Sequence, residues 1–126
     1  MLIDAHIHMA ASSLYTRQCY EAAEKRQRIE WIRKIFREYR KQNIYTLRDG
    51  GDVIGASLLA REIAPLEGIV YKSPIYALYK KGHYGSFIGR PIEDIKSFKE
   101  EFKTLLGYKP DHLKIILTGL VNFEKY

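Results

Sequence analysis

Cysteine is almost absent from this chain of 126 residues, which has only Cys19. A single thiol cannot form an internal disulfide framework, so small disulfide-stabilised domains are excluded and a reducing, cytoplasmic location is expected. The sequence also has no apolar run of about 18 residues, the minimum for a membrane-spanning helix. It does not begin with a basic segment followed by an apolar stretch. We therefore expect no membrane contact and no signal peptide.

An excess of basic charge is confined to one segment. The chain has 21 Lys and Arg against 15 Asp and Glu, a net charge of +6. The stretch from Arg17 to Arg48 has ten basic and four acidic residues, so it holds the whole excess. One basic segment is more typical of a solvated helix face than of a nucleic-acid-binding protein. With 46% hydrophobic and 29% charged residues, the chain is expected to fold.

Strand-like and helix-like patterns alternate along the chain. Strands are predicted over 1–8, 44–48, 69–79 (interrupted by Pro74) and 112–118. Helices are predicted from a cap at Ser12 or Ser13 to Gln42, over 53–64, and from Ile92 to a stop at Gly107. The segment 82–89 is predicted to be a loop, and 119–126 is predicted to continue without a helix. This alternation indicates βαβ units and a parallel sheet. Each unit has about 30 residues, which is the unit length expected when eight units make up the roughly 250 residues of a (β/α)8 barrel. The predicted fold is therefore α/β, the first four β/α units of a TIM-type barrel with parallel strands and outer helices.

The sharpest motif is His6-Ile7-His8 at the end of the first predicted strand. Residues at i and i+2 of a strand point to the same side. Two neighbouring imidazoles are suited to binding a divalent transition metal, although a chance pair of histidines is the simpler alternative. Asp4, His6 and His8 share the face expected to point inward, where buried polar groups need partners such as a metal.

Lys114 lies within an otherwise apolar segment, His112–Thr118. A lysine that points into a packed interior is costly unless it is paired or neutralised. The alternative is that Lys114 lies near the start of the strand and extends its ammonium group to solvent. The sequence leaves these two interpretations open.

Four segments in order resemble landmarks of the metal-dependent amidohydrolase superfamily, most closely its imidazolonepropionase-like and prolidase-like branch. They are Ile3–His8, Thr46–Gly51, Gly82–Gly85 and Asp111–Gly119. Together they extend over nearly the whole chain, so the resemblance implies that residues 1–126 are the N-terminal half of an amidohydrolase barrel, an incomplete domain.

The resemblance also implies a metal site and an activity. In that family the first-strand histidines, here His6 and His8, are metal ligands of a site with one or two zinc ions. A fourth-strand lysine, here Lys114, is carboxylated in binuclear members and bridges both ions. Metal-activated water then hydrolyses a C–N bond of an amide, a cyclic amide or a peptide. The loop after the third strand often lines the substrate site, which makes His83 and Tyr84 candidates for binding a small-molecule or dipeptide-like substrate; a surface position for His83 is equally consistent with the sequence.

The sequence departs from the family where the chain stops. The family's remaining ligands are histidines on the fifth and sixth strands and an aspartate on the eighth strand, and no catalytic residue is identified in this chain. His112 is a poor substitute because it lies at the wrong end of its strand. We therefore expect the chain alone to be inactive or incomplete. Because half a barrel has unpaired edges, we also expect it to pair with the missing C-terminal half or with a second copy.

Two other functions are considered. One is a non-catalytic binding module that uses the basic first helix, with Arg26, Arg33, Lys34, Arg37 and Lys41, for nucleic acid or an acidic partner. Interspersed glutamates weigh against nucleic acid. The other is a metal-dependent deoxyribonuclease-type hydrolase, whose family generally has a glutamate on the fourth strand. This chain has Asp111 and Glu124 near that strand but no acidic residue within it.

Overall fold

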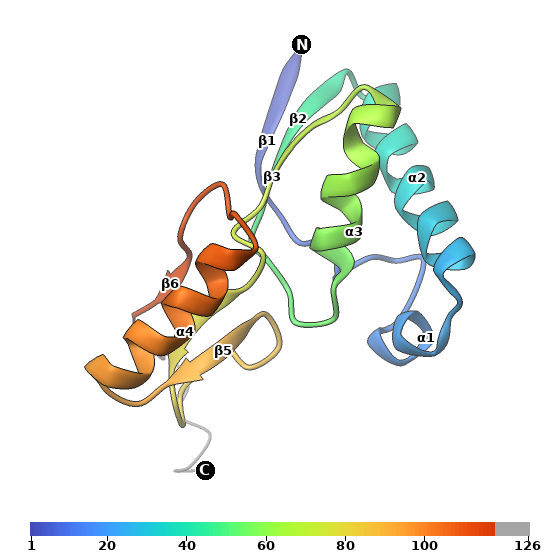
Figure 1. Cartoon of the computed structure of the whole chain (residues 1–126). Helices are drawn as coiled ribbons and strands as arrows, with labels where there is room; N and C mark the ends of the chain where they lie inside the picture. The colour runs from blue at the N-terminus through green and yellow to red at the C-terminus, as the bar shows by residue number, and fades with distance from the viewer. Residues whose placement is uncertain (118–126) are drawn as a thin grey trace.

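The computed structural model describes residues 1–117 and consists of two small parallel sheets with helices packed against them, without closure into a barrel (Figure 1). The predicted α/β class is confirmed. In chain order the elements are β1 (Leu2–Ile7), α1 (Arg17–Ala22), α2 (Lys25–Lys41), β2 (Ile44–Asp49), α3 (Ala56–Ile63), the 3-10 helix η1 (Ala64–Glu67), β3 (Val70–Lys72), β4 (Ala77–Lys80), β5 (Gly89–Ile92), α4 (Ile95–Gly107) and β6 (Ile115–Ile116).

The first sheet has the order β1-β2-β3, and all its strands are parallel. Leu47 of β2 pairs in register with Tyr71 of β3, and both side chains are buried in the core formed with α2 and α3. The next pair, Arg48 and Lys72, is exposed on the other side of the sheet. Alternation along the strands therefore separates an apolar face under the helices from an open face that carries cations.

The second sheet has the order β5-β4-β6, again parallel. The predicted single strand over 69–79 is wrong, because β3 and β4 belong to different sheets. Pro74 has no N–H for a strand ladder, and Ile75 has a φ of 69°, which is unusual for a β-branched residue. Ile75 keeps this conformation while its N–H donates to Ser73 Oγ and its carbonyl accepts from Asp52 N–H.

The predicted continuous helix from Ser12 or Ser13 to Gln42 is also wrong. Helix α1 begins after Thr16, whose Oγ1 accepts from the Cys19 N–H. The chain is extended at Ala23 and re-enters a helix after Glu24. Arg28 of α2 donates from Nη2 to the Glu21 carbonyl and lies over the Tyr20 ring, 5.0 Å from its centroid. These contacts satisfy a helix-end carbonyl and stabilise the break between the two helices.

The other boundaries differ less from the predicted ones. The strands predicted over 1–8 and 44–48 are confirmed, and the helices over 53–64 and after Pro91 are shorter, as α3 and α4. Helix α4 begins at a capping box in which Asp94 and Ser97 exchange hydrogen bonds. Strand β5 was not predicted, because its four residues include a glycine and a proline. The last predicted strand is reduced to β6; Thr118 and the segment 119–126 lie outside the described residues.

The core has two parts. The larger lies between the first sheet and α2 and α3; the smaller joins β4 to α4 through Leu78 and Leu105, which are both fully buried. Among the helices within residues 1–117, none has the length and apolar character needed to cross a membrane.

Candidate functional site

The His6 and His8 rings lie side by side where β1 ends. Their centroids are 5.1 Å apart and their planes are inclined at 57°. His8 is half-buried and His6 is exposed. The predicted pairing of the two imidazoles on one side of the chain is therefore observed, at the carboxyl end of a parallel strand. Binding and catalytic sites of parallel α/β folds gather at such ends.

Asp4 does not belong to the same face, which corrects the sequence analysis. It pairs in register with the buried Leu47, and a register shift follows before Ile7. The carboxylate contributes to raising the pKa of Tyr39 on α2, after the larger effect of burial, so it faces the helices. The predicted buried polar face is also wrong, because His6 is exposed and Asp4 and His8 are only half-buried.

Gly50 makes room for His8. A Cβ atom at Gly50 would lie 2.2 Å from His8 Cε1, closer than any real contact. His8 Nδ1 lies 3.4 Å from the Gly51 carbonyl oxygen. If Nδ1 carries the proton, Nε2 is left with the lone pair that binds a metal, the usual arrangement at histidine sites.

Asp49, at the end of β2, joins the segments around the pair. Its carboxylate is 1% exposed and accepts from the Met9 N–H at 2.7 Å, from the Tyr71 hydroxyl at 2.6 Å and from the Gly51 N–H. In the sequence Asp49 stands out only as a member of the Thr46–Gly51 segment. An acidic residue directly after a buried strand and before two glycines is the feature that could have revealed this role.

Asp52 secures the following turn. Burial raises its pKa, although its carboxylate accepts from the N–H groups of Ile54, Ala56 and Ser57, which favour ionisation. These bonds satisfy donors at the start of α3. The loop between β2 and α3 is thus held by two buried carboxylates, and Asp49 and Asp52 position the site without lining it.

Lys114 is half-buried just before β6, and its carbonyl accepts from the Leu78 N–H. Two residues earlier, burial followed by the charge of Arg48 lowers the pKa of the His112 ring, and the nearby Asp49 backbone opposes this shift. Residues two apart in an extended segment share a face. Lys114 therefore lies on the face that His112 presents to the end of β2, but no contact between Lys114 and the histidine pair is found within residues 1–117.

The loop between β4 and β5 brings one of its predicted residues near the pair. The Tyr84 and Phe87 rings meet edge to face, with centroids 5.0 Å apart. Phe87 and His8 both line an apolar cavity of about 180 Å³, with Arg17 also at its wall. His83 is half-buried, and its N–H donates to the Lys80 carbonyl. Tyr84 thus contacts Phe87, which lines the same cavity as His8, whereas nothing in the described structure relates His83 to that cavity.

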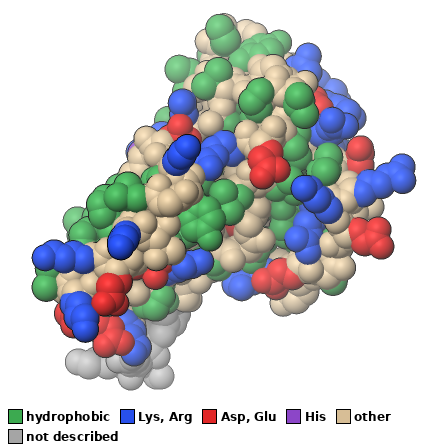
Figure 2. All heavy atoms as spheres, viewed as in Figure 1, with side chains coloured by type: hydrophobic (Ala, Val, Ile, Leu, Met, Phe, Trp, Pro, Cys, Tyr) green, Lys and Arg blue, Asp and Glu red, His purple; other side chains and the backbone are tan. Residues whose placement is uncertain are grey.

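The basic segment is partly neutralised. Three α2 arginines, Arg33, Arg37 and Arg40, surround the Glu67 carboxylate of η1 at 3.3, 4.0 and 3.8 Å. In Figure 2 the basic side chains along the right side of the molecule, over α2, are interspersed with acidic ones. The arginines thus connect α2 to η1, which weakens the interpretation of this helix as a nucleic-acid surface.

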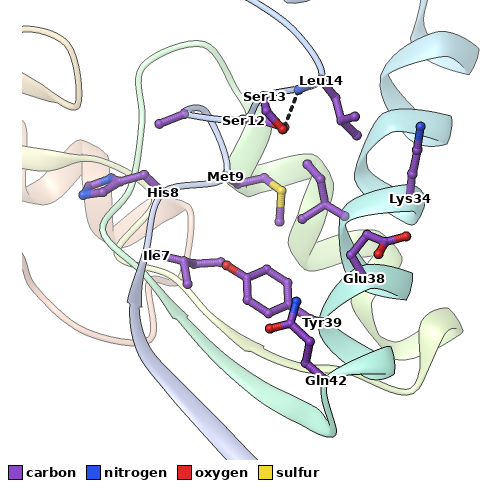
Figure 3. A pocket seen from close by; sticks show the side chains of 12 residues that line it. Ile7, His8, Met9, Ser12, Ser13, Leu14, Lys34, Glu38, Tyr39 and Gln42 are labelled. Carbon is purple, nitrogen blue, oxygen red and sulfur yellow. Dashed lines mark hydrogen bonds between the residues drawn. The ribbon is translucent and has the colours of Figure 1, made fainter.

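A larger cavity of about 410 Å³ lies between the end of β1, the loop that follows it and α2 (Figure 3). Ile7, Met9, Leu14, Ile35 and Tyr39 form its apolar wall, and Ser12, Ser13, Lys34, Glu38 and Gln42 add polar groups. His8 is at its border, but in Figure 3 its ring points away from the cavity. The cavity and the histidine pair therefore lie on different sides of the chain after β1.

Two imidazoles do not complete a metal site. No group of three or more His, Cys, Asp or Glu side chains within residues 1–117 is placed to hold a metal ion. Zinc sites in proteins have three or four protein ligands. The pair alone therefore offers fewer ligands than such a site has. Comparison with protein-family models, curated proteins and solved structures finds no match for this chain.

Proposed function

We propose that this chain is the metal-binding N-terminal part of a metal-dependent amidohydrolase. The observation that carries the proposal is the His6–His8 pair at the carboxyl end of β1, with Gly50 leaving space for the His8 ring. In this proposal β1, β2, the β3–β4 segment and β6 would be the first four strands of a barrel, although this structure divides the third of them between two sheets. The parallel direction of these strands supports that assignment.

His6 and His8 would hold a divalent cation, most readily zinc, because imidazole nitrogen is a preferred zinc ligand. Lys114 is the candidate for a third ligand after carboxylation. His8 packs on Gly50, and the pKa of His112 responds to the neighbouring Arg48 and Asp49, so the segments that carry His8 and Lys114 approach the same end of β2. Carboxylation would replace a half-buried cation with anionic oxygen ligands.

The bound metal would supply activated water and polarise the carbonyl of a C–N bond. The described residues contribute positioning. Gly51 orients His8 through its carbonyl, and Asp49 holds the ends of β1 and β2 together. The 180 Å³ cavity beside His8 would receive an apolar part of a small or dipeptide-like substrate. The remaining ligands and the proton-transferring carboxylate would come from a C-terminal half or a second copy.

The test is a zinc titration by calorimetry in a Cys19→Ser background, because the exposed Cys19 thiol is a competing ligand. His6→Ala and His8→Ala should each lower the zinc affinity by at least about tenfold, since even the loss of an outer hydrogen-bond partner costs that much at metal sites. His83→Ala is the matched control and should bind like the parent. Equal affinity of His6→Ala, His8→Ala and the parent would refute the proposal.

A further inference from the structure

The 410 Å³ cavity beside α2 has no role in the proposed metal site. It lies between the end of β1, the loop that follows it and α2, and the His8 ring at its border points away from it (Figure 3). Its volume is within the range of about 300–1,000 Å³ that is usual for small-molecule sites. The cavity is therefore a candidate binding site in its own right.

The middle of this cavity is apolar. Ile7 and Met9, which are 6% and 2% exposed, form the wall on the β1 side, and Ile35 lies on α2. In Figure 3 the Met9 side chain extends from the loop toward α2. Hydrocarbon placed between these walls would be removed from water, which favours a ligand with an apolar body.

The charge of the cavity wall is unbalanced. Lys34 of α2 lines the cavity and has no ion-pair partner within residues 1–117. Glu38, one turn further along α2, is the acidic residue of the lining, and the Lys41 ammonium binds its carboxylate at 2.8 Å. The charge that remains without a counterion is therefore positive. An anionic group on the ligand would complement it.

The two ends of the cavity differ in polarity. In Figure 3 Lys34 and Ser13 lie at one end, and Tyr39 lies at the other. The Ser13 hydroxyl has no hydrogen-bond partner within residues 1–117, so it is a second donor at the Lys34 end. At the Tyr39 end, the Asp4 carboxylate adds to the effect of burial in raising the Tyr39 pKa, so this end is less favourable for an anion. An anionic head group would therefore face Lys34.

We propose that this cavity binds a small apolar monocarboxylate. The hydrocarbon body lies between Met9 and Ile35, and the carboxylate accepts hydrogen bonds from the Lys34 ammonium and the Ser13 hydroxyl. This inference does not depend on metal binding, because neither imidazole of the His6–His8 pair contributes to it.

The test compares octanoate, octanol and octylammonium, which share a hydrocarbon tail and differ in the charge of the head group. The chain has two methionines, so methyl-labelled methionine gives two signals for nuclear magnetic resonance of the metal-free full chain. Octanoate should shift the Met9 methyl signal and leave that of Met1, which is 85% exposed, unchanged. Octanoate should bind at least about tenfold tighter than octylammonium, and the difference should decrease as salt is raised.

Lys34→Gln should lower the affinity for octanoate at least about threefold, the range of an exposed ion pair, and leave the affinity for octanol unchanged. The unchanged octanol affinity would show that the variant is folded. Arg26→Gln, an exposed α2 position that does not line the cavity, is the matched control and should bind octanoate like the parent.

Four results would overturn the proposal. They are equal binding of octanoate and octylammonium by the parent, an equal effect of the Lys34 and Arg26 substitutions, equal shifts of Met1 and Met9, and a Met9 signal that responds only to protein concentration. The last result would assign the cavity to a second copy of the chain.

Discussion

The His8 ring occupies the space that a side chain at position 50 would take. We expect Gly50→Ala to lower the free energy of unfolding by about 1–3 kcal/mol, because the added methyl group would lie 2.2 Å from His8 Cε1 and the ring must move. The displaced imidazole should also weaken zinc binding. Chemical denaturation and zinc titration measure the two effects.

Gly107→Ala is the control for that substitution. Gly107 ends α4, and a Cβ there would meet nothing within 4 Å. Alanine has a higher helix propensity than glycine, so this variant should be as stable as the parent or slightly more stable, with unchanged zinc affinity. Equal behaviour of the two variants would show that His8 does not depend on the space at Gly50.

His112 gives the protein a pH dependence of known sign. Burial and Arg48 lower its pKa in the folded protein from the ordinary 6.5. As pH falls below about 6.5, the unfolded chain therefore binds a proton first, and the stability due to His112 is lost until the folded pKa is passed. Urea unfolding should show a greater loss between pH 7.5 and 5.5 for the parent than for His112→Gln.

Comparing these two proteins isolates His112, because the other titratable groups are common to both. Asp52 acts in the opposite direction: its pKa is raised, so the folded protein takes up its proton first as pH falls, and this uptake adds stability. Identical pH profiles for the parent and His112→Gln would contradict the account of His112.

At the scale of elements, Thr16 starts α1. Its Oγ1 accepts from the Cys19 N–H, so Thr16→Ala should lower the free energy of unfolding by about 1 kcal/mol. Ser13→Ala is the control: Ser13 is exposed and caps no helix, although the sequence pattern made it a candidate. Denaturation of both variants would locate the cap, and a greater loss for Ser13→Ala would contradict the structure.

Local patterns predicted some elements better than others. The alternation around Ile7 and Leu47 predicted β1 and β2 because each strand has one buried face at this end. The break between α1 and α2 was not predictable, because it depends on Arg28 reaching the Tyr20 ring and the Glu21 carbonyl. The separation of β3 from β4 depends on Ile75, whose conformation is held by groups distant in sequence.

The candidate site could also be predicted only in part from local sequence patterns. A spacing of two residues predicted that His6 and His8 lie together. The support around them could not be predicted, because Asp49 binds Met9 and Tyr71, which are 40 and 22 residues away in sequence. The register shift between Asp4 and Ile7, which separates Asp4 from the face of the histidines, is likewise a feature of the pairing with β2. Short-range periodicity predicts which side chains share a face, but not which partners fix them.

At the scale of the whole molecule, the two parallel sheets formed by residues 1–117 place β1 at the outer edge of the β1-β2-β3 sheet. The histidine pair lies at the carboxyl end of that edge strand. The histidine pair and the outer edge of this sheet are therefore neighbouring features of the described structure.

The most direct test of the central claim is nuclear magnetic resonance of the four histidine side chains during zinc addition to Cys19→Ser protein. The account predicts that the ring signals of His6 and His8 shift together and saturate at the same zinc concentration. Those of His83 and His112 should change little, because nothing in the described structure connects either ring to the pair. Parallel shifts of all four histidines, or no shift of His6 and His8, would contradict it.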